Sequence, residues 1–219
     1  TIEQEPKVKE ILSEEARQKK SRIYDISEDN LNFKEKAGKY IDFLNANAYD
    51  KERDVRTNIA GEFQKSNLAA ALQTAELICG RLDEDKIYEA LSQIRISGRM
   101  EEIAPGIIVD VSHNIQGMQG FVQTVEANYH GMKKRILFAA SHQNEEEYMK
   151  NILKTIPEIE AFYTVGIHKR RIDEAEFQDA FRKMIDRNQE TTVCFVVGSF
   201  YLAGMAKEFI NQEEENVRL

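Results

Sequence analysis

The chain has 219 residues, 42% of them hydrophobic and 31% charged, with a formal net charge of −8 at pH 7. This length and apolar content suffice for one large core or two small ones. The acidic balance argues against a general nucleic-acid binder, because such proteins normally present a basic face.

No apolar run approaches the length of a membrane span, and no signal-peptide pattern opens the sequence, so we expect a cytoplasmic protein without a membrane contact. The two cysteines, Cys79 and Cys194, stand in apolar helical or strand contexts. We therefore expect both to be small core residues in a reducing compartment, not a disulfide or a metal site.

The first part of the chain mixes helical and strand patterns. Residues 7–20 carry apolar side chains at helical spacing, which predicts an amphipathic helix. Residues 21–26 have the pattern of a short strand. Residues 33–58 fit two strands joined by a polar connection at 47–53, so we expect a hairpin there.

Two helices are predicted next. Residues 67–79 are rich in Ala and Leu at helical spacing, and Gly80 follows where a helix stop belongs. Asp83 can cap a further helix over residues 84–94. After that helix the pattern changes, and we place a domain boundary near Ser97.

Beyond this boundary, apolar strands and amphipathic helices alternate. The predicted strands are 107–109, 135–140, 161–165 and 192–197, followed by helices 116–127, 145–155, 173–187 and 202–212. A regular strand–helix repeat indicates an α/β fold whose mostly parallel, Rossmann-like sheet has helices on both faces. The charged tail, residues 213–219, is expected to fray.

The most informative stretch surrounds the first of these strands. A Gly98-Arg99 turn leads into the buried strand, which ends in Asp110 and is followed by His113 and Asn114. Side chains at the carboxyl ends of strands in an open α/β sheet are well placed to form a site. The pattern alone also allows a simpler reading, in which Asp110 caps the next helix and His113 is a loop residue.

Several motifs resemble the Mur ligase family, most closely its folylpolyglutamate synthase/dihydrofolate synthase branch. That branch has a Gly-Arg-Leu/Phe-Glu segment before a strand ending in Asp-Gly-Ala-His-Asn-Pro, a Gly-x-His/Phe-Gln-x-x-Asn-Ala helix, a final Gly-Ser-Leu/Phe-Tyr and a Gln-x-Pro-x-Val run. The matching segments here are Gly98–Glu101, Asp110–Ile115, Gly61–Leu72, Gly198–Leu202 and Gln4–Val8. They follow the family's order but cover only the back half of its usual length.

The resemblance implies a division of the chain and a chemistry. Residues 1–96 would be an α+β remnant that ends the central ATPase domain, and residues 97–219 would be the carboxyl-terminal, glutamate-ligase domain. In such enzymes ATP phosphorylates a substrate carboxylate, and an amino acid then attacks the acyl phosphate. The implied substrates are ATP, folate and L-glutamate, with Mg²⁺, and we expect a monomer that binds no nucleic acid.

Five residues receive roles from the resemblance. Arg99 would meet the ATP phosphates, because a permanently charged, planar fork suits phosphate. Asp110 would contact the nucleotide ribose and Asn67 an adenine edge. His113 is the candidate catalytic residue and, with Asn114, would hold the incoming glutamate. Alternatives remain for two of them: Arg99 could form a salt bridge to Glu101 or Glu102, and Asn67, like Gln64 beside it, could cap a helix.

Some features depart from the family. A Gly-x-x-x-x-Gly-Lys-Ser/Thr phosphate loop is absent from the sequence, so we expect no turnover by this chain alone. The family's Gly-Ala pair is Val111-Ser112 here, and Gln143-Asn144-Glu145 replaces its Asp-Lys-Asp run. An alternative is therefore a degenerate paralogue that serves as a nucleotide- or folate-binding regulatory module; a third is an unrelated flavodoxin-like domain.

The other candidate sites are weaker. His130, His142 and His168 share no metal-ligand spacing, so we expect no metal site of their own. The basic cluster at residues 168–171 could attract an anionic tail or be a solvated loop. Gly198-Ser199 is expected to form a tight turn into the last helix.

Overall fold

The computed structural model describes residues 1–2, 4–26, 32–33, 42–44, 54–61, 63–80, 82–141, 143–169, 171–185 and 191–217. The chain divides into two compact units, Thr1–Arg95 and Ile96–Leu219. The division lies next to Ser97, where the sequence predicted a boundary. In the described part of the chain, no helix combines the length and the apolar character that a membrane crossing requires.

The described part of the first unit contains three helices and a small antiparallel sheet in the order β1-β2-β3. Six buried residues form its core, with Leu68 of α2 and Leu91 of α3 among them. Its elements are α1 (Pro6–Gln18), β1 (Asn32–Phe33), β2 (Asp42–Leu44), β3 (Asp54–Arg56), α2 (Gln64–Cys79) and α3 (Glu84–Gln93).

The sequence predicted the helices of this unit better than its strands. Gly80 ends α2 with a φ of 75°, and the carboxylate of Asp83 accepts a hydrogen bond from the Lys86 amide at the start of α3. Strands β2 and β3 pair as a hairpin would, while the connection predicted at 47–53 lies outside the described residues.

Two predictions for the first unit are wrong. Residues 21–26 form no strand; their only described ladder contact is a single bridge between Ile26 and Ile2, so the apolar pattern there lacks a partner strand. Cys79 is exposed at the end of α2 instead of buried, whereas Cys194 is in the core as expected.

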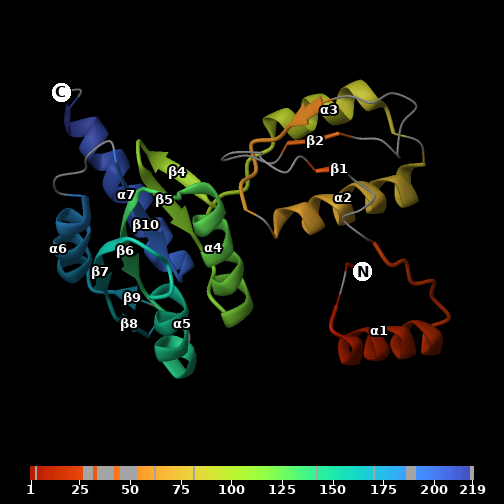
Figure 1. Cartoon of the computed structure of the whole chain (residues 1–219), viewed down its shortest axis with the longest axis horizontal. Coiled ribbons are helices and arrows are strands. Elements are labelled where there is room, and N and C mark those ends of the chain that lie inside the picture. The colour runs from red at the N-terminus through yellow and green to blue at the C-terminus, as the bar shows by residue number, and fades with distance from the viewer. Residues whose placement is uncertain are drawn as a thin grey trace. The chain divides into compact units, whose positions relative to one another are not determined.

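A five-stranded sheet in the order β4-β5-β10-β6-β7 forms the centre of the second unit (Figure 1). Strands β5, β10, β6 and β7 are parallel, and β4 is an antiparallel edge strand. The sheet strands are β4 (Glu101–Ala104), β5 (Ile107–Asp110), β6 (Lys133–Phe138), β7 (Ile159–Thr164) and β10 (Thr192–Val197), and the helices are α4 (Ile115–Asn128), α5 (Glu146–Leu153), α6 (Glu174–Ile185) and α7 (Phe200–Val217).

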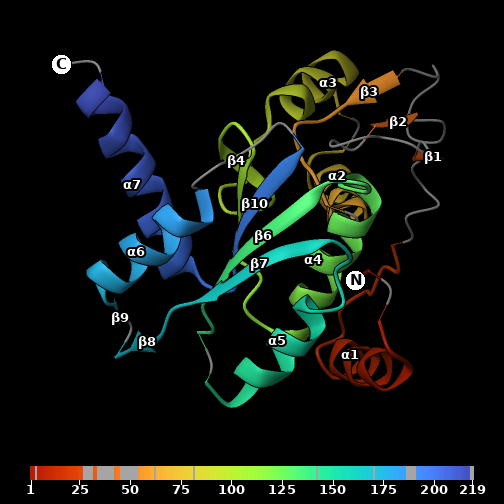
Figure 2. The ribbon, with the colours of Figure 1, turned by 60° about the vertical axis from the view of Figure 1, so that its left-hand side comes forward.

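Helices cover both faces of this sheet, as Figure 2 shows from a second angle. On one face, Val109 and Val196 belong to the same 17-residue core cluster as residues of α6 and α7. On the other face, the ring of Phe195 makes edge contacts with Phe121 and Tyr129, from α4 and its end. Burial on both faces explains why β5 and β10 are continuous apolar runs in the sequence. The predicted mostly parallel α/β sheet is confirmed.

The structure corrects the sequence prediction at three places in this unit. The edge strand β4 was missed, because its charged residues hide a strand pattern. A two-stranded hairpin of β8 (Ile167–His168) and β9 (Arg171–Ile172) precedes α6 and was also missed. The tail predicted to fray continues as helix to Val217, and an ion pair from Arg182 of α6 reaches Glu213 within it.

Candidate functional site

The Gly98-Arg99 turn is docked on the carboxyl end of β5. The carbonyl of Gly98 accepts a hydrogen bond from the Val111 amide at 2.8 Å. Gly98 has a φ of +71°, and a Cβ added there would lie 2.7 Å from a methyl of Val111, so this position requires glycine. The half-buried Arg99 follows directly, and its position is therefore fixed relative to the strand end.

Asp110 is fully buried at that strand end, and donors from its own unit surround its carboxylate. Its Oδ1 accepts from the amide and the hydroxyl of Ser112, at 2.9 and 2.6 Å. Its Oδ2 accepts from the Met100 amide at 3.0 Å. Burial raises the pKa of Asp110, although the bonds from Ser112 and Met100 and the charge of Arg99 oppose the rise. Asp110 thus ties the turn to the strand.

This arrangement leaves Asp110 little capacity for a ligand. A carboxylate offers about four lone-pair sites, and the three donors already take most of them. The role of Asp110 toward a ribose stays a prediction. The simpler alternative, in which Asp110 caps the next helix, is wrong: the cap of α4 is Asn114, whose Oδ1 accepts from the Gly117 amide at 2.7 Å.

His113 is held in a defined orientation by two contacts. Its Nδ1 lies 2.9 Å from the Val111 carbonyl, and its ring lies 5.4 Å from the ring of Phe200 between centroids. A carbonyl can only accept a hydrogen bond, so Nδ1 carries the proton. In the neutral ring Nε2 then presents a lone pair, which can accept a proton or a hydrogen bond from a ligand.

The end of β10, the strand next to β5, completes this edge. Gly198 has a φ of +108°, and a Cβ there would lie 2.6 Å from the Ala139 carbonyl oxygen. Its amide donates to the Asp110 carbonyl at 3.3 Å, which joins the two strand ends. The hydroxyl of the buried Ser199 accepts from the Tyr201 amide at the start of α7. The tight turn predicted here is confirmed.

Helices α4 and α7 both begin at these strand ends, so their amino termini face the same edge of the sheet. The positive ends of two helix dipoles, together with Arg99, favour an anionic group such as a phosphate or a carboxylate. The side-chain amide of Asn114 can donate to such a group while its oxygen caps α4.

The turn is also held by contacts with Lys207 of α7, which the sequence did not predict. The ammonium of Lys207 donates to the Ser97 hydroxyl and pairs with Glu101, each at 2.6 Å. Glu101 also accepts from the Gly98 amide at 2.6 Å. Burial alone would raise the pKa of Glu101, but its bonds to Lys207 and Gly98 outweigh burial, so the pKa is lowered. No local pattern signals this pairing, because more than 100 residues separate the partners.

Glu101 is therefore not paired with Arg99, as one alternative supposed, and Glu102 accepts from the Gly106 amide. Phe200 lies in the Gly198–Leu202 segment that carries the resemblance, but the sequence analysis gave it no role; in the structure its side chain is 59% exposed at the start of α7. Gln143–Glu145 form a short 3₁₀ turn between β6 and α5.

The structure brings together Arg99, Asp110, His113 and Asn114, but Asn67 lies in the first unit. There its amide donates to Gln64 at 2.8 Å, and neither residue supplies a side-chain cap for α2. Across the residues that the structure describes, no group of three or more His, Cys, Asp or Glu side chains could hold a metal ion.

Comparison with solved structures identifies the fold. The chain resembles the structure of a folylpolyglutamate synthase (FPGS)–AMPPCP–folate complex with a TM-score of 0.77 at 19% identity, over 96% of this chain and 52% of that one. It resembles the Thermotoga maritima enzyme with a TM-score of 0.70 at 22% identity, over 96% of this chain and 53% of that one. It resembles the Mycobacterium tuberculosis enzyme in complex with ADP with a TM-score of 0.65 at 16% identity, over 95% of this chain and 54% of that one.

This chain has the fold of a folylpolyglutamate synthase, over about half of that enzyme's length. No protein-family model matches the sequence, and no curated protein matches it. The predicted structural resemblance is confirmed, and it extends over both units because the match covers nearly the whole chain. At these identities the likeness establishes the fold, while the roles of individual residues remain predictions.

Proposed function

We propose that this chain is the carboxyl-terminal half of an ATP-dependent ligase that adds L-glutamate to a folate carboxylate through an acyl phosphate. The observation that carries the proposal is the match of 96% of the chain to folylpolyglutamate synthases, one of them in a complex with AMPPCP and folate. The site at the ends of β5 and β10 supports it, because its groups suit anionic substrates and an amine.

In this proposal Arg99 binds phosphate oxygens of ATP or of the acyl phosphate. Its guanidinium is always charged and can make two parallel hydrogen bonds to such a group. The turn that carries it is fixed by Gly98 and by Asp110, so little ordering is needed when the substrate arrives. Asp110 then acts mainly as the residue that positions Arg99.

His113 and Asn114 would act on the incoming amino acid. Attack on an acyl phosphate requires an uncharged amine, and the Nε2 lone pair of His113 can accept the proton that the ammonium gives up. The side-chain amide of Asn114 and the start of α4 can bind the amino acid's carboxylate. Holding the amine beside the activated carbonyl would supply much of the rate by proximity.

The magnesium that this chemistry requires does not fit this site. Asp110 is already bonded by three donors, and the described residues include no cluster of metal-ligating side chains. We therefore assign no step to a metal bound by this unit. The phosphate loop is also absent from the sequence, so the chain alone should not turn over.

The test is incorporation of labelled glutamate into a reduced folate by the full-length parent, with ATP and magnesium. We expect Arg99→Ala and His113→Ala each to lower activity about 100-fold. The matched controls are Arg95→Ala, at the exposed last residue of the first unit, and His130→Ala, at an exposed position just after α4, and both should keep activity. Full activity in Arg99→Ala and His113→Ala would refute the assigned roles.

One observation favours a second candidate function. In it the parent is a degenerate paralogue that binds a nucleotide or a folate and serves as a regulatory module. The 3₁₀ turn after β6 carries Gln143, Asn144 and Glu145, so it lacks the lysine of the resembled family. A full-length parent that binds nucleotide but incorporates no glutamate would support this candidate over the ligase.

A further inference from the structure

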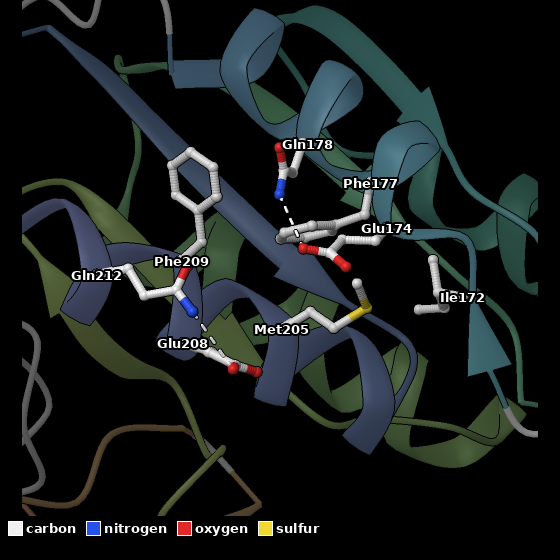
Figure 3. Close-up of a pocket in the computed structure, with 8 residues that line it drawn as sticks. All are labelled: Ile172, Glu174, Phe177, Gln178, Met205, Glu208, Phe209 and Gln212. Carbon is white, nitrogen blue, oxygen red and sulfur yellow. Dashed lines mark hydrogen bonds between the residues drawn. The ribbon is translucent and has the colours of Figure 1, made fainter.

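A groove between α6 and α7 shares no residue with the site described above. It has a volume of about 210 Å³ (Figure 3). Four apolar side chains form its floor and four polar ones its rim. They are Ile172, Phe177, Met205 and Phe209, and Glu174, Gln178, Glu208 and Gln212.

The floor of the groove consists of two packed aromatic rings at one end and a flexible methionine side chain at the other. The rings of Phe177 and Phe209 meet edge to face at 6.2 Å, and both side chains are buried. Beside them lies Met205, which is half-buried and whose thioether can adjust to different apolar partners. Met205 therefore offers more accessible apolar surface to a side chain from outside than the two buried rings do.

The rim repeats the same arrangement on the two helices. The amide of Gln178 donates to Glu174 at 3.1 Å on α6, and the amide of Gln212 donates to Glu208 at 3.4 Å on α7. In each case the glutamine is four residues after the glutamate. Each helix therefore presents one exposed carboxylate at the groove, steadied by its neighbour (Figure 3).

Three other acidic residues on or near these helices have their charge paired. Asp179, Glu213 and Glu101 each contact a cation of α6 or α7, namely Lys183, Arg182 and Lys207. Within the part of the chain that the structure describes, neither Glu174 nor Glu208 forms an ion pair. The helix dipole favours Glu174 in the first turn of α6, but Glu208 stands in the middle of α7.

The size of the groove decides between kinds of ligand. Pockets that enclose drug-sized molecules are typically about 300–1,000 Å³, so a groove of about 210 Å³ fits one or two side chains better than a whole small molecule. The acidic rim would repel nucleic acid and the anionic lipids of a membrane surface. Of these ligand classes, a positively charged protein segment is the one that fits both the size and the charge of the groove.

We propose that this groove docks a basic amphipathic helix of a partner protein. Its apolar side chains lie on Phe177, Met205 and Phe209, and its Lys or Arg side chains pair with Glu174 and Glu208. Packing a helix against two helices reuses a common recognition mode. The net charge of −8 would speed the encounter with such a segment.

The test uses the full chain with methyl-labelled methionine, which gives six signals. The probe is a synthetic helical peptide with leucines on one face and lysines along its flanks, beside a twin with glutamates in place of the lysines. We expect the lysine peptide to shift the methyl signal of Met205, assigned through Met205→Leu. The fully buried Met118 and Met149 should not respond, and the glutamate twin should shift none of the six.

Variants then separate the groove from general charge attraction. The double variant Glu174→Gln, Glu208→Gln should weaken binding about three- to tenfold, as expected for two exposed ion pairs. The matched control, Glu126→Gln with Glu147→Gln, removes the same charge from α4 and α5 and should leave the affinity unchanged. No shift of Met205, an equal shift by the glutamate twin, or equal weakening by the control would each overturn the proposal.

Discussion

The two units of the chain differ in how completely they cover their own apolar faces. In the second unit every residue of β5 and β10 is buried, and helices cover both faces of the sheet. Among the described residues of the first unit, the core cluster has six members, and α1 has no buried residue. Ile11 of α1 and Ile78 of α2 are 57% and 77% exposed.

The difference shows which part of the chain can hold a site by its own packing. A 13-residue helix such as α1 is marginal in water without a packed face, whereas the residues around Asp110 are fixed by a closed core and by buried hydrogen bonds. The chain also spans only about half the length of the similar solved structures, and the exposed apolar side chains of the first unit are found in that same chain. We expect stability to be distributed as unevenly as burial.

The largest effect is expected at the centre of the second unit's sheet. Phe195→Ala removes a ring with no exposed surface and its contacts to Phe121 and Tyr129, and it should lower the free energy of unfolding by about 3–5 kcal/mol. Leu68→Ala in the first unit's small core should cost about 2–3 kcal/mol. Urea denaturation measures both, and a larger loss in Leu68→Ala would reverse the comparison.

A somewhat smaller effect should follow from Gly198→Ala. This substitution forces an alanine into a left-handed conformation and places its Cβ against the Ala139 carbonyl, at a cost of about 2–3 kcal/mol. Gly204→Ala is the matched control in α7. Nothing lies within 4 Å of its added Cβ, and the better helix former should stabilise the protein by about 0.5–1 kcal/mol. Thermal melts of the two variants should therefore move in opposite directions.

A helix-capping side chain can be replaced by alanine in each of the two units, which allows a direct comparison. Asn114→Ala removes a 2.7 Å bond to the Gly117 amide, and Asp83→Ala removes a 3.3 Å bond to the Lys86 amide. Each should cost about 1 kcal/mol in denaturant unfolding, with the larger loss for Asn114 because its bond is shorter and its helix packs on the main core. Equal losses would mean that the two units hold their helices equally well.

The sequence predicted elements whose signals are local. Continuous apolar runs located β5 and β10, Gly80 marked the end of α2, and Asp83 marked the start of α3. The charged edge strand β4 was missed because an edge strand needs only one buried face. Residues 21–26 were wrongly predicted as a strand because alternation alone does not supply a partner.

The same limit applies to the site. Asp110, His113 and Asn114 could be placed together because they follow one strand. The docking of Gly98 on Val111 and the contact of Lys207 with Glu101 could not be predicted, since both depend on how distant segments pack. Likewise, only the structure shows that the carboxylate of Asp110 already has three donors, which changes what that residue can do.

The smallest expected effect concerns the amino-terminal ends of the sheet strands, at the edge opposite the candidate site. There Lys134 of β6 is buried and its ammonium lies 2.9 Å from the carboxylate of Glu158. That bond is the main reason why the pKa of Glu158 is lowered from its usual 4.5. A lowered pKa means that the stabilisation is present above the unfolded-state pKa and is lost as the pH falls through the folded-state value.

Glu158→Gln should therefore lower the melting temperature at neutral pH, and the difference from the unmodified protein should shrink as the pH falls below about 4.5. Glu126→Gln, an exposed carboxylate on α4, serves as the control and should show little difference at either pH. A difference for Glu158→Gln that stays constant with pH would mean that its charge does not stabilise Lys134. The amino-terminal edge of the sheet would then depend on packing alone, as the centre of the sheet does.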